Sequence, residues 1–516
     1  MSVLNCFVKL FCKLLDIIAF VYGNLRFPSR KNQLPAVENN VLLMSAVEIA
    51  QKIKERKLKA VDVVKAYLKR IEQVNPIINA VIKSREEAIR EAEQIDEKLE
   101  HDWESVGHLP LLGVPFTAKD TVSVEGMPLC AGLVSRKEEV ASEDASVVTN
   151  LRRAGAIPIA ITNVPELTRC LDASNCAFGR TNNPYDLSLT CGGSSGGEGA
   201  ILSSAGSIIG VGTDIGGSIR LPAYFCGVFG HKITSGVVSN NGIIPTIEAE
   251  IAPMFTAGPM SRYASDLKLM LKAMAGDQIE RLPKIDSAVD LSKLRIFYML
   301  ESGSPWSSPV PVQNKEAILK VVSHFEQTYK VKCTKVDVKK VSDALSMWTA
   351  AMTKETPMSV FMANNQGEVN LFLEVIRKLF GRSSHTIAAI AWAIDQKIYS
   401  LFPNQVESKL REIKQLKQEL NELLGNDGIF LYPCFPDINV KHDTSILFWR
   451  NIGYTTVFNI TNLPVTQCPL GLNKNGLPLG VQVAANELND HITLAVAQEI
   501  EKVFGGWIPP FPIKRD

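Results

Sequence analysis

Hydrophobic residues recur along most of this chain in runs that predict helices and buried strands. The first run extends from Val3 to Tyr22 and is broken mainly by Lys9, Lys13 and Asp16. Together with Asn5, these polar residues follow one another at spacings of four, four and three, so on a helix they share one narrow stripe. The pattern fits either a helix in the membrane interface or a poor transmembrane span.

Residues 1–33 are less suited to be a cleaved signal peptide, because charged residues interrupt the apolar run and no small-residue cleavage site follows it. Arg26, Arg30 and Lys31 come after the run and are expected to stay on the cytosolic side. We therefore predict a membrane-associating helix within residues 1–33.

Further helices are indicated along the chain. Ser45 and Glu48 frame a capping box, which predicts an amphipathic helix that continues toward Leu68. Residues 85–99 are rich in charge and predict a solvated helix. Prolines and serines punctuate residues 277–313, which predicts a surface excursion. Residues 371–402 form two apolar halves around a Gly-Arg-Ser-Ser break, and either two core helices or a membrane-facing cap fits them.

The run from Leu111 to Asp120 predicts a buried strand that ends on a charged residue, Lys119. A lysine in that position is buried or shielded, and burial disfavours the ammonium form. A lysine of lowered pKa can act as a general base near neutral pH. Lys119 is therefore a candidate base.

The stretch from Cys191 to Gly230 carries two serines framed by glycines, Ser194 and Ser218, which lie 24 positions apart. Flanking glycines let the backbone take unusual conformations and leave room for a substrate carbonyl. In the sequence Asp-Ile-Gly-Gly-Ser at 214–218, small residues can turn several backbone N–H groups toward one point, as an oxyanion hole requires. Ser218 is the candidate nucleophile.

A serine hydroxyl needs a base within hydrogen-bond reach. The chain has seven histidines, and none lies in a glycine-framed or acid-paired motif: His101, His108, His231, His324, His385, His442 and His491. Lys119 is therefore the candidate base. Gly192 to Gly196 matches the G-x-S-x-G pattern of α/β-hydrolases, but a loop rather than a strand precedes it. A phosphate-binding loop is not supported, because the glycine-rich stretch has no lysine.

Three segments together, LLGVPFTAKD, GGSSGG and GTDIGGSIRLPA, resemble the amidase signature family of serine hydrolases. The resemblance extends roughly over residues 42–510 and implies one catalytic domain. The implied fold is α/β, an α/β/α arrangement with a mixed twisted central sheet surrounded by helices. Within the family, GGSSGGEG, FGHK and LAVAQEIEKVFGGW are most similar to fatty-acid amide hydrolases of the second, membrane-associated subtype.

The resemblance also implies roles for individual residues. Ser218 would attack an amide carbonyl, while Ser194, the cis-serine of a Ser–cis-Ser–Lys triad, would pass its proton to neutral Lys119. Backbone N–H groups at four positions would hold the oxyanion: Ile215, Gly216, Gly217 and Ser218. Three residues would support the loop rather than react: Ser195, Asp214 and Arg220. No metal or organic cofactor is implied.

The composition suits a globular protein: of 516 residues, 46% are hydrophobic and 21% are charged. A net charge of +1 without strong runs argues against a nucleic-acid partner. Cysteines number ten and show no metal-type spacing, so we expect reduced thiols, mostly buried, in a protein facing the cytosol. Cys191 is expected to pack rather than react. The sequon at Asn459 lies in an apolar run and is expected in the core.

These observations predict a membrane-associated hydrolase of long-chain fatty-acid amides, either N-acylethanolamines or primary amides. Its expected partners are the lipid amide and a membrane surface, that of the endoplasmic reticulum or of a lipid droplet, with a homodimer as the assembly to test. Three alternatives stay open: an amidase for small soluble amides, a subunit of the amidotransferase that amidates misacylated tRNA, and a catalytically silent membrane scaffold. The joint presence of Lys119, Ser194 and Ser218 argues against the last.

Overall fold

The computed structural model describes residues 3–514. The α-helices are α1 Val3–Arg26, α2 Ala46–Lys54, α3 Ala60–Ile78, α4 Glu87–His101, α5 Trp103–Val106, α6 Ser146–Arg153, α7 Gly196–Ser203, α8 Arg220–Phe225, α9 Ala264–Ala275, α10 Val312–Thr328, α11 Ala344–Met352, α12 Met358–Met362, α13 Leu371–Leu379, α14 Ile387–Ser400, α15 Pro403–Leu424, α16 Gly453–Ile460 and α17 Asp490–Phe504. The 3-10 helices are η1 Asn40–Leu43, η2 Val134–Arg136, η3 Glu166–Thr168, η4 Ala252–Met254, η5 Gly276–Arg281, η6 Leu291–Lys293, η7 Lys339–Asp343 and η8 Ser445–Ile452.

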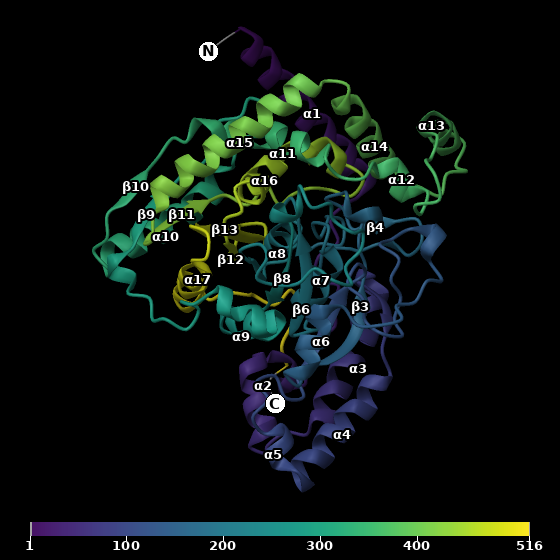
Figure 1. The fold of residues 1–516 in the computed structure, drawn as a ribbon, viewed down its shortest axis with the longest axis vertical. Coiled ribbons are helices and arrows are strands. Elements are labelled where there is room, and N and C mark those ends of the chain that lie inside the picture. The colour runs from purple at the N-terminus through teal and green to yellow at the C-terminus, as the bar shows by residue number, and fades with distance from the viewer. Residues whose placement is uncertain (1–2, 515–516) are drawn as a thin grey trace.

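The strands are β1 Val81–Ser84, β2 Pro115–Lys119, β3 Ile157–Thr162, β4 Ser174–Asn175, β5 Gly179–Arg180, β6 Ile209–Asp214, β7 Phe229–Lys232, β8 Thr256–Ser261, β9 Arg295–Tyr298, β10 Cys333–Lys335, β11 Gly428–Tyr432, β12 Val465–Leu472 and β13 Pro478–Ala485. Eleven of them form one sheet in the order β1-β3-β2-β6-β8-β7-β12-β13-β11-β9-β10. The sheet is mixed: β2 runs parallel to β3 and β6, whereas β8 runs antiparallel to β6 and β7. Helices surround it (Figure 1), which confirms the predicted α/β fold.

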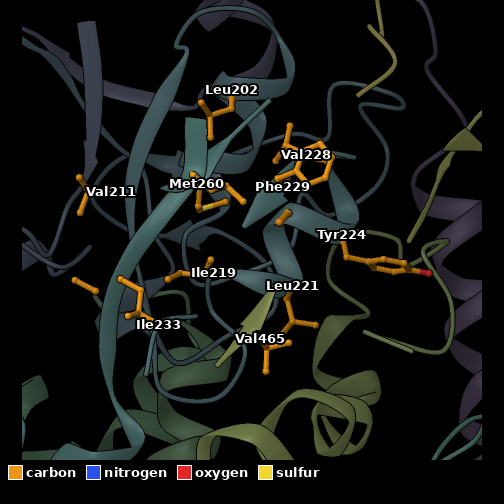
Figure 2. Close-up of a cluster of buried hydrophobic side chains, with 14 of the residues drawn as sticks. Leu202, Val211, Ile219, Leu221, Tyr224, Val228, Phe229, Ile233, Met260 and Val465 are labelled. Carbon is orange, nitrogen blue, oxygen red and sulfur yellow. The ribbon is translucent and has the colours of Figure 1, made fainter. Parts of the chain in front are cut away.

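The central strands are buried along their whole length because both of their faces are covered. Every residue of β2, β3 and β6 is buried, as expected for strands enclosed between helices. Figure 2 shows part of this core, in which side chains from β6, β7, β8 and β12 pack around α8: Leu202, Val211, Ile219, Leu221, Tyr224, Val228, Phe229, Ile233, Met260 and Val465. The core fixes the ends of β2 and β6, which carry Lys119 and Asp214.

The structure differs from the predicted elements in two places, a helix that is divided and a strand that was not predicted. The capping box is present, with Glu48 N donating to Ser45 Oγ at 3.1 Å and Ser45 N donating to Glu48 Oε2 at 2.8 Å. The helix toward Leu68 is nevertheless two helices, α2 and α3, separated by a turn in which Arg56 has a φ of 57°. The prediction of a surface excursion over residues 277–313 missed β9, a strand of four residues too short to show a period against the surrounding prolines and serines.

The N-terminal helix α1 lies against the rest of the fold on the side that carries Asp16, whereas Lys9 and Lys13 of the polar stripe are exposed. Asp16 forms an ion pair with Arg450 and accepts a hydrogen bond from Ser308 Oγ at 3.0 Å. Cys12 and Ala19 are buried on the same side, while most of the large apolar side chains of α1 are exposed. Across residues 3–514, no helix combines the length and the apolar character needed to cross a bilayer.

Residues 371–402 divide into α13 and α14, as predicted, but the two helices differ in burial. α14 buries Ile390 and Trp392 in the core. α13 instead leaves Phe372 73% exposed, and Leu379 and Phe380 follow it at 80% and 75%. α14 is therefore partly core, with one side exposed at Ile387 and Ile398, whereas α13 is open surface. Both helices lie at the same end of the molecule as α1 (Figure 1).

Candidate active site

The structure places two of the predicted site residues in direct contact. Lys119 is the last residue of β2, and its Nζ donates hydrogen bonds to Ser194 Oγ at 2.6 Å and to Thr213 Oγ1 at 2.8 Å. Both hydroxyl groups come from the glycine-rich segment, Ser194 just before α7 and Thr213 near the end of β6. The Gly193–Ser194 peptide bond is cis. A buried amine thus faces two hydroxyl groups.

Burial lowers the pKa of Lys119 to about 7. The negative charge of Asp214 opposes this change, and the positive charge of Arg169 adds to it. The lysine is fully buried, so water cannot compensate for the lost hydration of an ammonium group. Near neutral pH a large fraction of Lys119 is therefore unprotonated and able to accept a proton.

Ser218 lies on the turn between β6 and α8, beside Ser194. Its backbone carbonyl accepts a hydrogen bond from Ser195 N at 3.1 Å, which ties the two serine segments together. Within residues 3–514, Ser218 Oγ makes no hydrogen bond and its side chain is partly exposed to a cavity. A hydroxyl that faces a cavity and has no hydrogen-bond partner is suited to attack a bound carbonyl. Catalytic hydrogen bonds often tighten only when substrate binds, so Ser218 need not contact Ser194 in the free protein.

Three of the four predicted oxyanion donors make no hydrogen bond within the described part of the chain: the N–H groups of Ile215, Gly216 and Ser218. Gly217 differs from the prediction, because its N–H donates to Asp214 Oδ1 at 2.7 Å. Gly217 also has a φ of 118°, and a Cβ there would lie 2.3 Å from Thr455 Oγ1. Gly217 therefore shapes the turn, while its neighbours leave their N–H groups available.

A buried ion pair braces this turn. Arg220 donates to Asp214 through Nε and Nη2, both at 3.0 Å. Burial alone would raise the pKa of Asp214, but the charge and hydrogen bonds of Arg220 outweigh it and hold the pKa well below its ordinary value. Ser195 supports the adjoining strand, since its Oγ accepts a hydrogen bond from Thr213 N at 3.3 Å.

Sequence reasoning missed the residues that complete this brace, because they come from distant elements. Asn459 Nδ2 donates to Asp214 Oδ1 at 2.8 Å, and Asn459 Oδ1 accepts from Arg220 at 2.6 Å. Gln482 Oε1 accepts from Arg220 at 2.8 Å, and Thr455 Oγ1 donates to Gly216 O at 2.7 Å. Trp348 Nε1 donates to Ile215 O at 2.8 Å. Only Asn459 had a signal in the sequence, as a polar residue in an apolar run.

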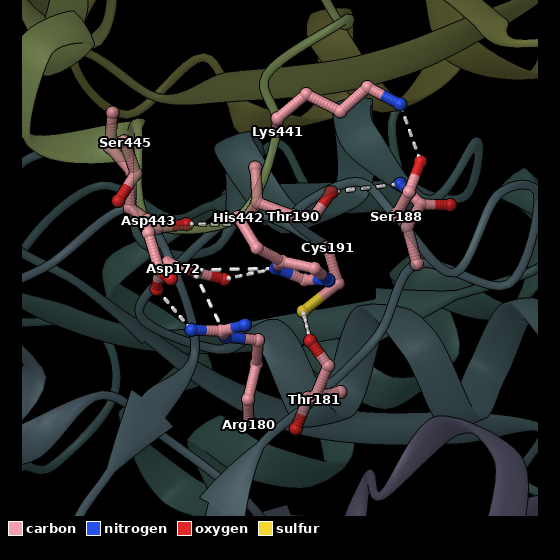
Figure 3. Close-up of polar contacts among 12 residues, drawn as sticks. Asp172, Arg180, Thr181, Ser188, Thr190, Cys191, Lys441, His442, Asp443 and Ser445 are labelled. Atoms are coloured by element: carbon pink, nitrogen blue, oxygen red, sulfur yellow. Dashed lines mark hydrogen bonds and ion pairs between the residues drawn. The ribbon is translucent and has the colours of Figure 1, made fainter. Parts of the chain in front are cut away.

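A second polar network holds the start of the glycine-rich loop (Figure 3). Figure 3 shows Thr190 and Cys191 beside Asp172 and His442 in this network. Thr190 Oγ1 accepts from Gly192 N at 3.1 Å and donates to Leu171 O at 3.0 Å. Next to it, His442 Nδ1 lies 3.2 Å from Asp172 Oδ1. Cys191 packs among these groups, fully buried, and burial raises the pKa of its thiol well above the ordinary value. The expectation that Cys191 packs rather than reacts fits this environment.

The histidines take no part in the contacts of Ser218, Ser194 or Lys119. Four of them pair with carboxylates elsewhere: His231 with Asp490, His324 with Glu499, His385 with Glu166 and His442 with Asp172. Across residues 3–514, no three His, Cys, Asp or Glu side chains come together in a way that could hold a metal ion. The chemistry available at the site is that of serine hydroxyls, a lysine and backbone N–H groups.

Two cavities meet at the site. A small cavity of about 20 Å³ is lined by Gly193, Gly216 and Ser218. A larger cavity of about 650 Å³ extends from it toward α1 and α14. Arg169, Cys170 and Trp449 line both. Trp449 packs against two further tryptophans, Trp348 and Trp392, with ring centroids 6.0 and 5.4 Å away.

Comparison with known proteins agrees with the geometry. Residues 62–494 match the family model described as Amidase. The chain is 44% identical to fatty-acid amide hydrolase 2 of Homo sapiens, over 95% of this chain and 94% of that protein. It is 42% identical to fatty-acid amide hydrolase 2-B of Danio rerio, over 93% of each chain. A solved structure of fatty acid amide hydrolase superposes with a TM-score of 0.71 at 22% identity, covering 91% of this chain and 86% of that one.

The mixed α/β sheet and the match to the family model define an amidohydrolase, an enzyme that acts on amide C–N bonds. The chain belongs to the amidase signature family. The expectation of an enzyme is thereby confirmed, and the interpretation as a silent scaffold is set aside.

Proposed function

We propose that this amidohydrolase cleaves long-chain fatty-acid amides, with Ser218 as nucleophile, Ser194 as proton relay and Lys119 as base. The observation that carries the proposal is the 2.6 Å hydrogen bond from Lys119 Nζ to Ser194 Oγ, beside a cavity that Ser218 lines. The names of the relatives point to the same substrate class.

In the proposed reaction, Ser218 Oγ bonds to the amide carbonyl carbon and gives up its proton to Ser194. Ser194 in turn passes its own proton to neutral Lys119. The carbonyl oxygen becomes an oxyanion, which the free N–H groups of Ile215, Gly216 and Ser218 can stabilise. The removal of one such donor commonly lowers turnover by about 10²–10³-fold.

The same relay serves the leaving group. An amine leaves readily only when it is protonated, so the proton returns from Lys119 through Ser194 to the amide nitrogen as the C–N bond breaks. Water then attacks the acyl carbonyl carbon, and Ser194 and Lys119 take a proton from this water. As the bond between the acyl carbon and Ser218 Oγ breaks, the same proton returns from Lys119 through Ser194 to Ser218 Oγ, and the fatty acid is released. Lys119 ends each half-reaction neutral.

The larger cavity supports a lipid substrate. Apolar and aromatic side chains supply much of its wall, among them Phe11 and Leu15 of α1, Ala391 and Trp392 of α14, and Trp449. Burial of an acyl chain against such a wall is favourable by about 0.8 kcal/mol per CH₂ group. Its volume of about 650 Å³ is that of a site for a molecule larger than a short amide.

Membrane association also belongs to this proposal. The helices α1 and α13 lie at the same end of the molecule (Figure 1). Both helices expose apolar side chains, and residues of α1 line the larger cavity. Exposed apolar surface of this kind marks a site of interaction with a membrane or a partner. A lipid amide could then reach Ser218 without crossing bulk water.

Labelling with a fluorescent fluorophosphonate tests the proposal. The probe should label the wild type and Ser235→Ala, whose hydroxyl contacts only backbone carbonyls away from the cavities. It should not label Ser218→Ala, and Ser194→Ala should react about 10²–10⁴-fold more slowly. N-oleoylethanolamine should block labelling better than a short amide. Protection by the short amide alone would move the enzyme to the class acting on small soluble amides.

A further inference from the structure

One charged residue lines both cavities. Arg169 follows η3, is 5% exposed, and contributes to the wall of the small cavity beside Ser218 and to the wall of the larger cavity. Its charge is also among the causes of the lowered pKa of Lys119, so it lies close to the reacting groups. A guanidinium at the junction of the two cavities is unusual in a site that otherwise suits an acyl chain.

The guanidinium of Arg169 is only partly used by the protein. Its Nη2 donates a short hydrogen bond to Glu355, which is buried beside it. Within residues 3–514 this is the single hydrogen bond of the Arg169 side chain, although a guanidinium carries five N–H donors. No nitrogen of Arg169 is both fully buried and without a hydrogen-bond partner. Donors on Nε and Nη1 are therefore available to a bound molecule.

The charge of Arg169 is already balanced. Glu355 makes the pair neutral overall, so an anionic group in the cavity would place two negative charges on one buried guanidinium. An uncharged oxygen instead accepts a hydrogen bond from a cation without adding charge, and hydrogen bonds to charged groups are the stronger ones. The pair thus favours a neutral acceptor over a carboxylate.

We propose that Arg169 binds an uncharged oxygen that the substrate carries close to its amide group, and that Glu355 makes this subsite select against carboxylates. The oxygen can be a hydroxyl on the amine portion or on the first carbons of the acyl chain, because Arg169 borders both the nucleophile and the larger cavity. This inference rests on the proposed function, in which a lipid amide occupies the two cavities.

Matched substrate pairs test the subsite. N-oleoylethanolamine and N-propyloleamide differ by a hydroxyl against a methyl group on the amine side. The pair 2-hydroxyoleamide and oleamide differs by a hydroxyl on the acyl side. For one of these pairs, the wild type should show a kcat/KM about 10–100-fold higher for the hydroxylated member, the range for a hydrogen bond to a charged group. The pair that shows the preference identifies the side on which the oxygen lies.

Three variants distinguish a role of the Arg169–Glu355 pair in substrate recognition from a purely structural role. Arg169→Met with Glu355→Gln removes the donors and the balancing charge together, and it should reduce the preference to about 1. The control Arg85→Met with Glu91→Gln alters an ion pair that lines neither cavity, and it should keep the preference. Glu355→Gln alone leaves a positive Arg169, so hydrolysis of N-oleoylglycine relative to N-oleoylethanolamine should rise by at least about tenfold.

Equal rates of the wild type on both members of both pairs would overturn the subsite while leaving lipid amide hydrolysis intact. A uniform loss on all substrates in the double variant, with no gain for N-oleoylglycine in Glu355→Gln, would assign the pair a structural role only. Failure of the wild type to hydrolyse any of the lipid amides would count against the proposed function itself.

Discussion

Lys119 and Lys232 are both buried lysines of lowered pKa, and their contacts distinguish them. Burial lowers the pKa of both Lys119 and Lys232 to about 7. Lys119 donates to two hydroxyl groups, one of them that of Ser194, whereas Lys232 donates to the backbone carbonyl of Leu463 at 3.0 Å. A shifted pKa therefore does not identify a base by itself. The hydrogen bond from Lys119 to Ser194 does so in the proposed mechanism.

The pKa of Lys119 predicts how activity changes with pH. The base acts in its neutral form, so kcat/KM should fall about tenfold per pH unit below about 7 and level off above that value. A soluble short amide, assayed from pH 5 to 9 without membranes, gives this profile directly. Lys232→Met should keep the shape of the profile, whereas Lys119→Met should abolish activity. A flat wild-type profile between pH 5 and 8 would speak against a lysine base.

Asn459 is predicted to position the oxyanion turn. Its replacement by Ala removes hydrogen bonds to a buried carboxylate and a buried guanidinium, each worth about 1.5–3 kcal/mol. Fluorophosphonate labelling of Ser218 should slow by at least about tenfold, together with a lower Tm. Asn314→Ala is the control, because this buried amide contacts Tyr224 and Pro436 instead and should lose only stability. Unchanged labelling in Asn459→Ala would remove its positioning role.

At the scale of elements, the site is built where strands end. β2 and β6 lie side by side and parallel, and they carry Lys119 and Asp214 at the same edge of the sheet. The turn from β6 into α8 then presents Ser218 to the cavities. α14 contributes to the wall of the larger cavity, while α13 provides an exposed apolar surface.

The exposed apolar surface of α13 predicts that Leu379 and Phe380 contribute to membrane binding. Replacing Leu379 and Phe380 with Glu should reduce sedimentation with phosphatidylcholine liposomes several-fold, because charges in the interface oppose insertion of apolar side chains. Hydrolysis of a short soluble amide should not change, since neither residue lines the cavities. Val312→Glu is the control, an apolar residue 67% exposed at the start of α10. Loss of liposome binding and short-amide hydrolysis together would indicate a damaged core instead.

At the scale of the whole molecule, the sequence predicts features that are local and misses those that join distant segments. The strand ending in Lys119, the capping box at Ser45 and the break between α13 and α14 all follow from short patterns. Apart from Asp214, the side-chain and backbone groups that bind Arg220 lie 235 to 262 positions away, and Glu355 lies 186 positions from Arg169. Such contacts depend on how the sheet brings β6, β13 and α16 together, which no local pattern records.

The resemblance to a family predicts the site residues but not their environment. It implies an oxyanion role for Gly217, whereas the N–H of Gly217 donates to Asp214 in the structure. It also gives no sign that Asp16 of α1 pairs with Arg450. Both cases concern the partner that a group contacts in the folded protein, Asp214 for the Gly217 N–H and Arg450 for Asp16, and these contacts shape the surroundings of the cavities.

Trapping the acyl-enzyme tests the central claim most directly, because it identifies the nucleophile and the acyl chain together. The enzyme would be mixed with N-oleoylethanolamine, quenched in acid within one turnover, digested and analysed by mass spectrometry. The account predicts an oleoyl group on Ser218, absent in Ser218→Ala. An oleoyl group on another residue, or hydrolysis of the lipid with no acylated peptide at any quench time, would contradict it.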